Sequence, residues 1–552
     1  MSIIPDGTCR SLAALPASEF LRRWDTLPPE DQADAMRGRF RYDRGSFLKF
    51  TLPALFGRPW NRYHADVLGR DSAPWVSRTG RNTYRCDAAP RGIAKTTLLK
   101  GELVHDVCYG LENYIVVVSA ETRLARAITR HLFRVFRSAD SKLARLFGPF
   151  VVDGGVDSFA VTTPDGHRTG FLARSFGTQI RGANEDGDRP TKIVIDDGER
   201  PDRVRNPDQR VIWMDFLQSD ILNAGPIEGG LVVDWRGTVL HPDSTLANLL
   251  KNVGWSGVLY RACEAWPTNT ALWEECRRIY VDLSIGTEAE RWTAAHEFYG
   301  ANRAEMDAGA KMLDDAALPL FAFYVEIWTK GIGYVLRERQ NDPRDPSRSF
   351  FRPEAFARCQ VEPTAIVSAA GKRIALTELE VAVWHDRSKG GATNDYPATA
   401  VVARDAQGYR YVLSVEMTRE PTSAQRARVW RTWERWRAAK RIVVGCDDTA
   451  QTEVFAGESW QRDRDTRQKA GIAWNLDIRS VTLDENKEVR IASIEPDCVN
   501  GWLQFSSGLP PSVWEQFRDF PTAAYDDAPD AIERANWLLT DSTPMVSSRA
   551  RG

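Results

Sequence analysis

The stretch AAPRGIAKTT, at Ala88–Thr97, decides how the first half of the chain folds. A loop that holds nucleotide phosphates needs backbone N–H groups curled around them, a lysine that reaches the β- and γ-phosphates, and a hydroxyl for Mg²⁺. Lys95 and Thr96 fit the last two roles, and a helical pattern follows them. Ala89 and Ala94 stand where the usual pattern has glycine. The loop alone therefore leaves open an ordinary surface turn with a solvated lysine.

A second segment, KIVIDD at 192–197, is an apolar strand that ends in two carboxylates. Such an ending suits Mg²⁺ ligation by Asp196 and activation of the attacking water by the next acid. Asp197 is the candidate by position and Glu199 is the alternative, although a plain acidic turn would have the same sequence. Together, loop and strand favour a site for ATP and Mg²⁺, with cofactor contacts from Arg91, Gly92, Ala94, Lys95, Thr96, Thr97 and Asp196.

The composition is that of an ordinary globular protein. The chain has 552 residues, of which 43% are hydrophobic and 27% charged, and this length favours two or three domains. The net charge is only −2, so any nucleic-acid contact must come from a local basic patch. The eight cysteines form no CxxC pair, which argues against a zinc site. We find no signal peptide and no apolar run long enough for a membrane span.

The order of patterns predicts two α/β regions. From residue 47 to about 250, short β-branched runs alternate with helical patterns, which is typical of a parallel sheet. A Trp-rich helical stretch follows, and NDPRDPSR, at Asn341–Arg348, is expected to be a loop. A second strand-rich region ends in a helix at Ala528–Leu539. We predict a helical N-terminal segment at 1–45, α/β domains at 46–260 and 365–540, a helical lid or linker at 261–364, and a flexible tail at 541–552.

Acidic residues close three segments of the second region. Asp386 ends the strand at 381–385, Asp447 ends the strand RIVVGC at 441–446, and Asp527 precedes the last helix. Asp526 and Asp530 compete with Asp527 for one role, Asp448 competes with Asp447, and Asp395 is a candidate auxiliary ligand.

These acids fit a metal-dependent nuclease. Hydrolysis of a phosphodiester needs an activated water and a stabilised leaving oxygen, and two divalent cations ~3.5–4 Å apart supply both. Hard cations take oxygen ligands, so carboxylates from separate strands suit them. We therefore expect Mg²⁺, or Mn²⁺ as an alternative, to be held by Asp386, Asp447 and one or more of Asp526, Asp527 and Asp530. Taken alone, each acid is more simply interpreted as a solvated carboxylate at the end of a strand.

The stretch Ser423–Arg441 reads as a basic helix in which tryptophans alternate with arginines. We expect its tryptophans to pack on a sheet. Its basic residues are open to phosphate contact or to plain solvation: Arg426, Arg428, Arg431, Arg435, Arg437, Lys440 and Arg441.

Over about residues 47–540, the order of these segments resembles the large terminase subunits of tailed bacteriophages. The loop at 89–97 resembles the family's variant Walker A, the stretch at 179–197 its approach to Walker B, and WRGTVLHP at 235–242 its Gly-Thr coupling motif. The acid set resembles its nuclease site, with Lys487 and Arg490 in matching places. Asp447 stands where the family usually carries glutamate, and Tyr525 where histidine is frequent.

The resemblance implies a RecA-like P-loop ATPase domain followed by an RNase H-like nuclease domain. It implies ATP-driven packaging of double-stranded DNA into a procapsid, with cutting of concatemers. The implied partners are a portal protein and a small terminase subunit, and the implied assembly is a homo-oligomeric ring in the cytoplasm of the bacterial host. Arg91, Arg181 and Arg189 are candidates for an arginine that acts across subunits.

Three other functions remain open. A helicase or translocase without cutting activity would lack the acid set of the second region. A non-motor RNase H-like recombinase or resolvase would not need the strand at 192–197 or Gly237-Thr238. A decayed prophage copy with only a structural role would not keep all of these positions intact.

Overall fold

The computed structural model describes residues 29–70, 80–180, 187–343, 351–387, 397–418, 420–447, 458–471, 477–481, 487–521 and 525–540, besides the single positions 19, 23, 26 and 523. The expectations for Arg181, Asp395, Asp448 and the tail 541–552 lie outside the described residues.

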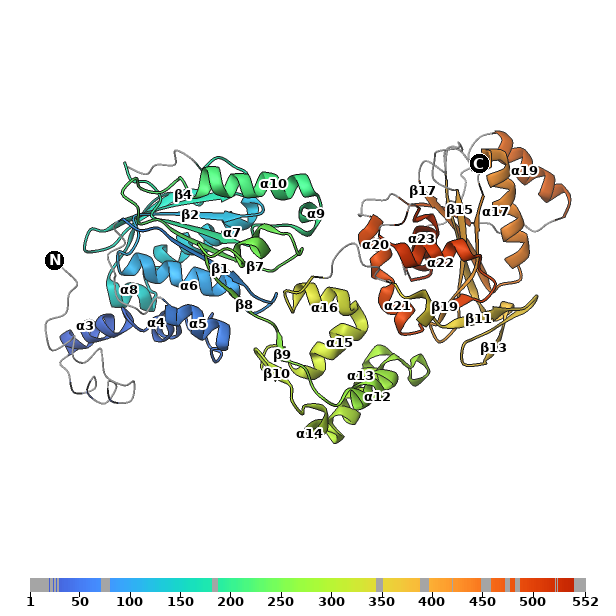
Figure 1. Ribbon diagram of the computed structural model, residues 1–552, viewed down its shortest axis with the longest axis horizontal. Coiled ribbons are helices and arrows are strands. Elements are labelled where there is room, and N and C mark those ends of the chain that lie inside the picture. The colour runs from blue at the N-terminus through green and yellow to red at the C-terminus, as the bar shows by residue number, and fades with distance from the viewer. Residues whose placement is uncertain are drawn as a thin grey trace. The chain divides into compact units, whose positions relative to one another are not determined.

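The chain forms two compact units (Figure 1). Unit 1 comprises Met1–Thr268, Gly309–Phe323 and Tyr334–Arg344. Unit 2 comprises Asn269–Ala308, Tyr324–Gly333 and Asp345–Gly552. The helices expected at 261–364 are therefore shared between the two units.

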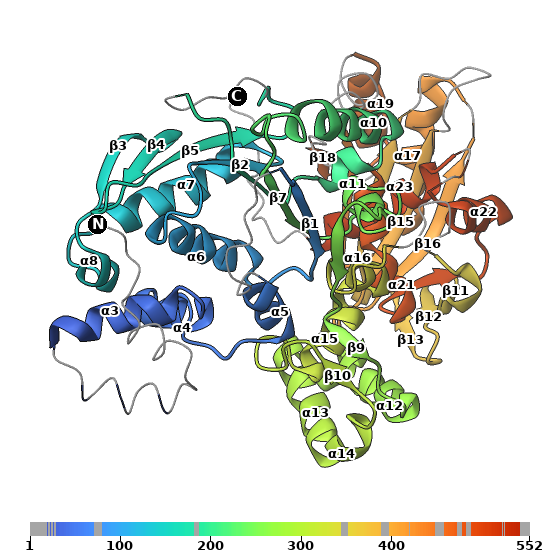
Figure 2. The ribbon, with the colours of Figure 1, turned by 60° about the vertical axis from the view of Figure 1, so that its left-hand side comes forward.

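Unit 1 is built on an eight-stranded sheet with the order β3-β4-β5-β2-β6-β7-β1-β8 (Figure 2). Strands β5, β2, β6, β7, β1 and β8 run parallel, whereas β3 and β4 form an antiparallel edge. Strands β2 and β6 are buried along their whole length, which explains their apolar sequences. The strands are β1 Thr83–Ala88, β2 Tyr114–Ser119, β3 Val151–Gly155, β4 Ser158–Thr162, β5 Arg168–Ser175, β6 Lys192–Asp196, β7 Val232–Gly237 and β8 Ser256–Leu259. A separate pair joins β9 Cys263–Ala265 and β10 Lys311–Met312.

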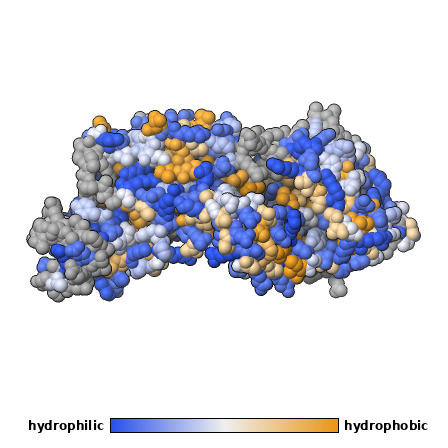
Figure 3. Space-filling view, turned by 60° about the horizontal axis from the view of Figure 1, so that its bottom comes forward, coloured by the Kyte–Doolittle hydropathy of each residue, from blue (hydrophilic) through white to orange (hydrophobic). Residues whose placement is uncertain are grey.

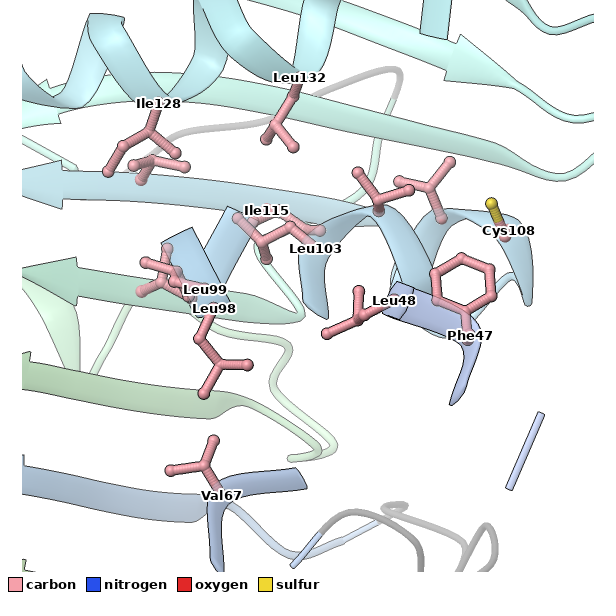
Figure 4. Close-up of a cluster of buried hydrophobic side chains, with 14 of the residues drawn as sticks. Phe47, Leu48, Val67, Leu98, Leu99, Leu103, Cys108, Ile115, Ile128 and Leu132 are labelled. Atoms are coloured by element: carbon pink, nitrogen blue, oxygen red, sulfur yellow. The ribbon is translucent and has the colours of Figure 1, made fainter. Parts of the chain in front are cut away.

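Helices cover both faces of this sheet. On one face α4, α5, α6 and α7 enclose a core around Leu98, Leu103 and Ile115 (Figure 4). On the other face α10 and α11 pack against Trp235 and its neighbours. The helices are α3 Pro29–Phe40, α4 Arg44–Thr51, α5 Arg62–Arg70, α6 Lys95–Cys108, α7 Thr122–Arg137, α8 Lys142–Phe147, α9 Pro201–Val204, α10 Pro207–Phe216, a π-helical turn Leu217–Ile221 and α11 Thr245–Leu249.

Unit 2 contains a nine-stranded mixed sheet with the order β13-β12-β11-β19-β16-β15-β14-β17-β18. Strands β14, β15 and β16 form an antiparallel meander, and β17 lies parallel beside β14. The strands are β11 Arg358–Val361, β12 Ala365–Val367, β13 Arg373–Ala375, β14 Glu380–Asp386, β15 Ala398–Arg404, β16 Arg410–Met417, β17 Arg441–Asp447, β18 Asp477–Val481 and β19 Leu503–Ser506.

Two helices cover opposite faces of the unit 2 sheet. Helix α23 packs its alanines and Ile532 against Trp384 on one face. Helix α17 buries Trp430, Trp433 and Trp436 on the other, which confirms the expected packing of the tryptophans. The helices are α12 Thr270–Val281, α13 Glu288–Ala301, α14 Arg303–Met306, α17 Thr422–Trp436, α19 Glu458–Lys469, α20 Lys487–Ser493, α21 Glu495–Val499, α22 Pro511–Asp519 and α23 Asp527–Thr540. Helices α15 Leu320–Lys330 and α16 Ile332–Glu338 each span a division between the units.

Two α/β units with mixed sheets, preceded by helices, confirm the predicted fold class. The face shown in Figure 3 is mixed, with hydrophobic patches among hydrophilic residues. Within the described ranges, no helix has both the length and the apolar character that a bilayer span requires.

The contact of α6 with α4 and with the bend that follows α4 depends on Gly101. A Cβ atom at this position would lie 2.6 Å from Leu48 Cδ2 and 2.8 Å from Phe56 Cζ, both of which are buried. We predict that Gly101→Ala lowers the free energy of unfolding by roughly 1–3 kcal/mol, because overpacking outweighs the better helix propensity of alanine. Urea denaturation measures this change.

Gly69 is the matched control, because it also lies in a helix of unit 1 but has no atom within 4 Å of its Cβ position. Gly69→Ala should stabilise the protein by up to about 1 kcal/mol. Equal effects of the two substitutions would contradict the close approach at Gly101.

Candidate functional sites

The predicted phosphate loop connects β1 to α6 and curls through two left-handed residues. Gly92 has φ 91° and Ala94 has φ 62°. For alanine this conformation costs roughly 1–2 kcal/mol. Ala94 therefore adopts, at this energetic cost, the left-handed conformation that glycine usually adopts at this position. Helix α6 begins at Lys95. The first N–H groups of a helix lack intrahelical partners, so an anion is stabilised at this end.

The Lys95 side chain is buried at 6% exposure. Its Nζ donates to the carbonyl oxygens of Ala89 at 2.8 Å and Pro90 at 3.2 Å, and to Thr238 Oγ1 at 3.1 Å. Burial lowers the pKa of Lys95, and the nearby Asp197 and Asp196 oppose this effect. All three partners are uncharged acceptors, so a phosphate group would be a stronger partner for the ammonium.

Thr96 and Asp196 lie together beside the loop. Thr96 Oγ1 donates to Asp196 Oδ2 at 2.7 Å. Burial, and then the neighbouring Asp197, raise the pKa of Asp196 to about 6. Within the described part of the chain, the buried Oδ1 of Asp196 has no hydrogen-bond partner. A hydroxyl beside a carboxylate with an unsatisfied buried oxygen fits a Mg²⁺ ion.

Asp197 and Glu199 have different surroundings. Asp197 adopts φ 44° and is close enough to Lys95 to affect its pKa. The Glu199 carboxylate instead accepts from the N–H groups of Thr245 at 2.6 Å and Leu246 at 3.4 Å, at the start of α11. Burial raises the pKa of Glu199 to about 7. Glu199 therefore caps a helix, and Asp197 is the acid that lies nearer to the lysine.

The acids of unit 2 gather at one edge of its sheet. Strands β14 and β17 are parallel neighbours with His385 opposite Cys446, so Asp386 and Asp447 end adjacent strands. Burial, and then the neighbouring Asp530, Asp527 and Asp447, raise the pKa of Asp386 to about 7, although Lys487 lowers it. Helix α23, which carries Asp527 and Asp530, packs against β14, so these acids belong to the part of the fold that carries Asp386.

Lys487 lies within this cluster. Its Nζ is 2.7 Å from Asp526 Oδ1 and 3.3 Å from Asp530 Oδ2. Arg490 Nη1 is 2.9 Å from Asp530 Oδ1. Asp527 is buried at 2% exposure at the first turn of α23. Asp526 and Asp530 are thus ion-paired with cationic side chains, and Asp527 is the third acid that we favour as a metal ligand.

Carboxylate oxygens suit a hard cation, but the carboxylates of Asp526 and Asp530 form ion pairs with Lys487 and Arg490. Among the described residues, no three His, Cys, Asp or Glu side chains already stand close enough to hold a metal ion. Metal binding at Asp386 and Asp447 would therefore require Lys487 to shift or the carboxylates to turn.

Two buried polar residues, Arg428 and Asn341, could not be recognised from the sequence. Arg428 was considered for DNA contact, but it is 1% exposed and donates to the carbonyl oxygens of Pro397, Glu416 and Thr418. Its role is therefore structural. Asn341, expected in a loop, is buried beside Val239. An arginine in a helix or an asparagine next to Asp-Pro carries no sequence signal for burial.

The pKa of Glu199 predicts how stability depends on pH. The unfolded chain releases this proton near pH 4.5, whereas the folded protein keeps it up to about pH 7. The stability that the protonated Glu199 contributes is therefore lost as pH rises across this window. Relative to Glu199→Gln, the wild-type protein should lose on the order of 3 kcal/mol of unfolding free energy between these pH values. Denaturation of both proteins across the window measures it, and a constant difference would contradict the assignment.

No family model matches the sequence, and no curated protein matches it. The large terminase from the thermophilic bacteriophage D6E, in crystal form 3, aligns at 11% identity and a TM-score of 0.42, over 87% of this chain and 100% of that one. The HK97 bacteriophage large terminase aligns at 11% identity and a TM-score of 0.30, over 90% and 99%. Both are large terminases, the family that the motif order indicated. At these identities and TM-scores, activity has to be inferred from the two sites themselves.

Proposed function

We propose that the chain is a viral DNA-packaging motor subunit, which hydrolyses ATP to move double-stranded DNA into a procapsid and cuts concatemeric DNA. One observation carries this proposal: a single chain joins a curled phosphate loop, with Lys95 and the Thr96–Asp196 pair, to a separate cluster of acids around Asp386. A motor needs the first site, and a cutting enzyme needs the second.

In the ATP site, Lys95 would exchange the carbonyls of Ala89 and Pro90 for the β- and γ-phosphates. Thr96 and Asp196 would hold Mg²⁺, which neutralises charge that develops on the phosphates. Asp197 would orient the attacking water, because it lies near Lys95 while Glu199 caps α11. Lys95 donates to Thr238, so a movement of the lysine would alter the contact with the Gly-Thr segment.

In unit 2, Asp386, Asp447 and Asp527 would hold the divalent cations. Bound Mg²⁺ or Mn²⁺ supplies the activated water and stabilises the leaving oxygen. The ammonium of Lys487 would neutralise Asp526 and Asp530, so that fewer negative charges repel the DNA backbone. Cutting should show weak sequence preference, since phosphate contacts carry no base information.

The motif order supports the remaining parts of this proposal. They are a ring of copies of this chain on a portal protein, recruitment by a small terminase subunit, and action in the cytoplasm of the bacterial host.

An ATP-driven DNA translocase that does not cut is the second candidate. It is favoured by the ion pairs of Lys487 within the acid cluster. It is also favoured by the lack, among the described residues, of a ready arrangement for a metal ion.

Lys95→Ala should lower kcat for ATP hydrolysis by roughly 10²–10³-fold, because the cation at the developing phosphate charge is lost. A phosphate-release assay measures it, with circular dichroism to verify the fold. Lys100→Ala, in the same helix, is the control and should retain activity. Undiminished hydrolysis by folded Lys95→Ala would remove the ATP-site assignment.

Asp386→Asn should abolish cutting of plasmid DNA in Mn²⁺ or Mg²⁺ while ATP hydrolysis continues, since the two sites lie in different units. Cutting activity should fall by more than roughly 10–100-fold, which is the usual effect of removing a residue that only hydrogen-bonds to a metal ligand. Asp463→Ala, an ion-paired acid on α19, is the control and should cut normally. If folded wild-type protein cuts with neither metal, the translocase without nuclease activity replaces the proposal.

A further inference from the structure

The segment Glu338–Asn341, which we call the clasp, ends α16 and lies within unit 1. Three of its four side chains are almost fully buried, although all are polar: Glu338 at 2%, Gln340 at 2% and Asn341 at 3% exposure. A buried polar group that loses its partner is strongly destabilising. The buried polar groups of the clasp therefore need the contacts that they make, and these contacts lead to the phosphate loop.

The clasp contacts the phosphate loop at Arg91, through both the N–H and the carbonyl oxygen of that residue. The backbone N–H of Arg91 donates to the carbonyl oxygen of Glu338 at 2.9 Å. The Arg339 guanidinium donates through Nη1 to the carbonyl oxygen of Arg91. The same Nη1 lies 3.1 Å from the place where Gly92 would carry a Cβ atom. The guanidinium therefore rests directly on the curled part of the loop.

The clasp also holds the segment that follows the Gly-Thr motif. Asn341 Oδ1 accepts from the N–H of Val239 at 2.8 Å, and its Nδ2 donates to the carbonyl oxygen of Tyr260 at 2.8 Å. Val239 directly follows Thr238, whose hydroxyl accepts from Lys95. Asn341 has φ 51°, a left-handed conformation that asparagine adopts more readily than most residues.

Gln340 and the backbone of Arg339 add further hydrogen bonds to the chain where it passes from β8 to β9. Gln340 Oε1 accepts from the N–H of Cys263 at 3.1 Å, and its Nε2 donates to the Cys263 carbonyl at 3.0 Å. The N–H of Ala262 donates to the Arg339 carbonyl at 2.8 Å. The clasp therefore joins the phosphate loop, the Gly-Thr segment and the chain at 260–263. Unit 1 ends shortly after it, at Arg344, and the chain continues in unit 2.

We propose that Arg339 is a positioning residue for the phosphate loop, and that the clasp passes the state of the loop to the Gly-Thr segment and to the chain at 260–263. The proposal rests on the ATP site proposed above. When phosphate replaces the carbonyls of Ala89 and Pro90 on Lys95, the turn at 89–91 has to readjust. The clasp is hydrogen-bonded to both the N–H and the carbonyl oxygen of Arg91, so this readjustment moves the clasp. A ligand shifts such an element only if it binds its two states unequally.

The test uses the full chain with ATP-γ-S and Mg²⁺, and measures both binding and amide hydrogen exchange. We expect ATP-γ-S to change exchange at Arg91, Val239 and Ala262 in the wild-type protein. Arg339→Ala should weaken ATP-γ-S binding about 10-fold, and Arg339→Lys should restore part of it, because an ammonium can still donate to the Arg91 carbonyl. Arg37→Ala is the control, since Arg37 donates to the Leu146 carbonyl at 2.5 Å, away from the loop.

Asn341→Gly provides a second variant that tolerates the positive φ and removes the amide bonds. It should bind ATP-γ-S but lose the nucleotide-dependent change at Val239. If wild-type protein binds ATP-γ-S, yet exchange at these amides does not respond and Arg339→Ala binds normally, the clasp proposal is wrong and the ATP site stands. If wild-type protein binds no nucleotide, both proposals fall.

Discussion

The buried ion pair between Arg236 on β7 and Glu102 on α6 fixes the helix that carries Lys95. This ion pair belongs to a network of three basic and three acidic side chains. They are Arg44, Lys192 and Arg236 with Glu102, Asp106 and Asp234. Each of these side chains is at most 6% exposed. Removing one partner from such a pair leaves an unpaired buried charge, which costs about 3–5 kcal/mol. The network therefore ties α4, α6, β6 and β7 into one rigid body.

This constraint brings the parts of the proposed ATP site together. Helix α6 supplies Lys95 and Thr96 at its start, β6 supplies Asp196 at its end, and β7 leads into Thr238. The network therefore supports the helix and strands from which the phosphate loop and the Gly-Thr segment extend. Hydrogen bonds join the phosphate loop to the clasp.

The sequence predicted the strand ends well, because buried parallel strands read as apolar runs and their terminal acids are conspicuous. Asp196, Asp386 and Asp447 all lie where the pattern placed them. Position alone favoured Asp197 over Glu199, but the sequence could not show why Glu199 differs, since Glu199 caps α11, which begins more than forty residues later. The resemblance placed Lys487 with the acid set, but the sequence could not foresee its ion pairs with Asp526 and Asp530, because α20 and α23 meet only in the folded unit. Long-range polar contacts such as those of Asn341 leave no local pattern.

A crystal structure with Mn²⁺ and a non-hydrolysable ATP analogue would show whether one chain holds an ATP site in unit 1 and a separate metal site in unit 2. We expect the phosphates on the loop at Gly92–Thr97, with Mn²⁺ beside Thr96 and Asp196, and further Mn²⁺ at Asp386 and Asp447. Phosphates bound elsewhere, or Mn²⁺ absent from the acids of unit 2 while Lys487 keeps its ion pairs, would disprove the two-site proposal.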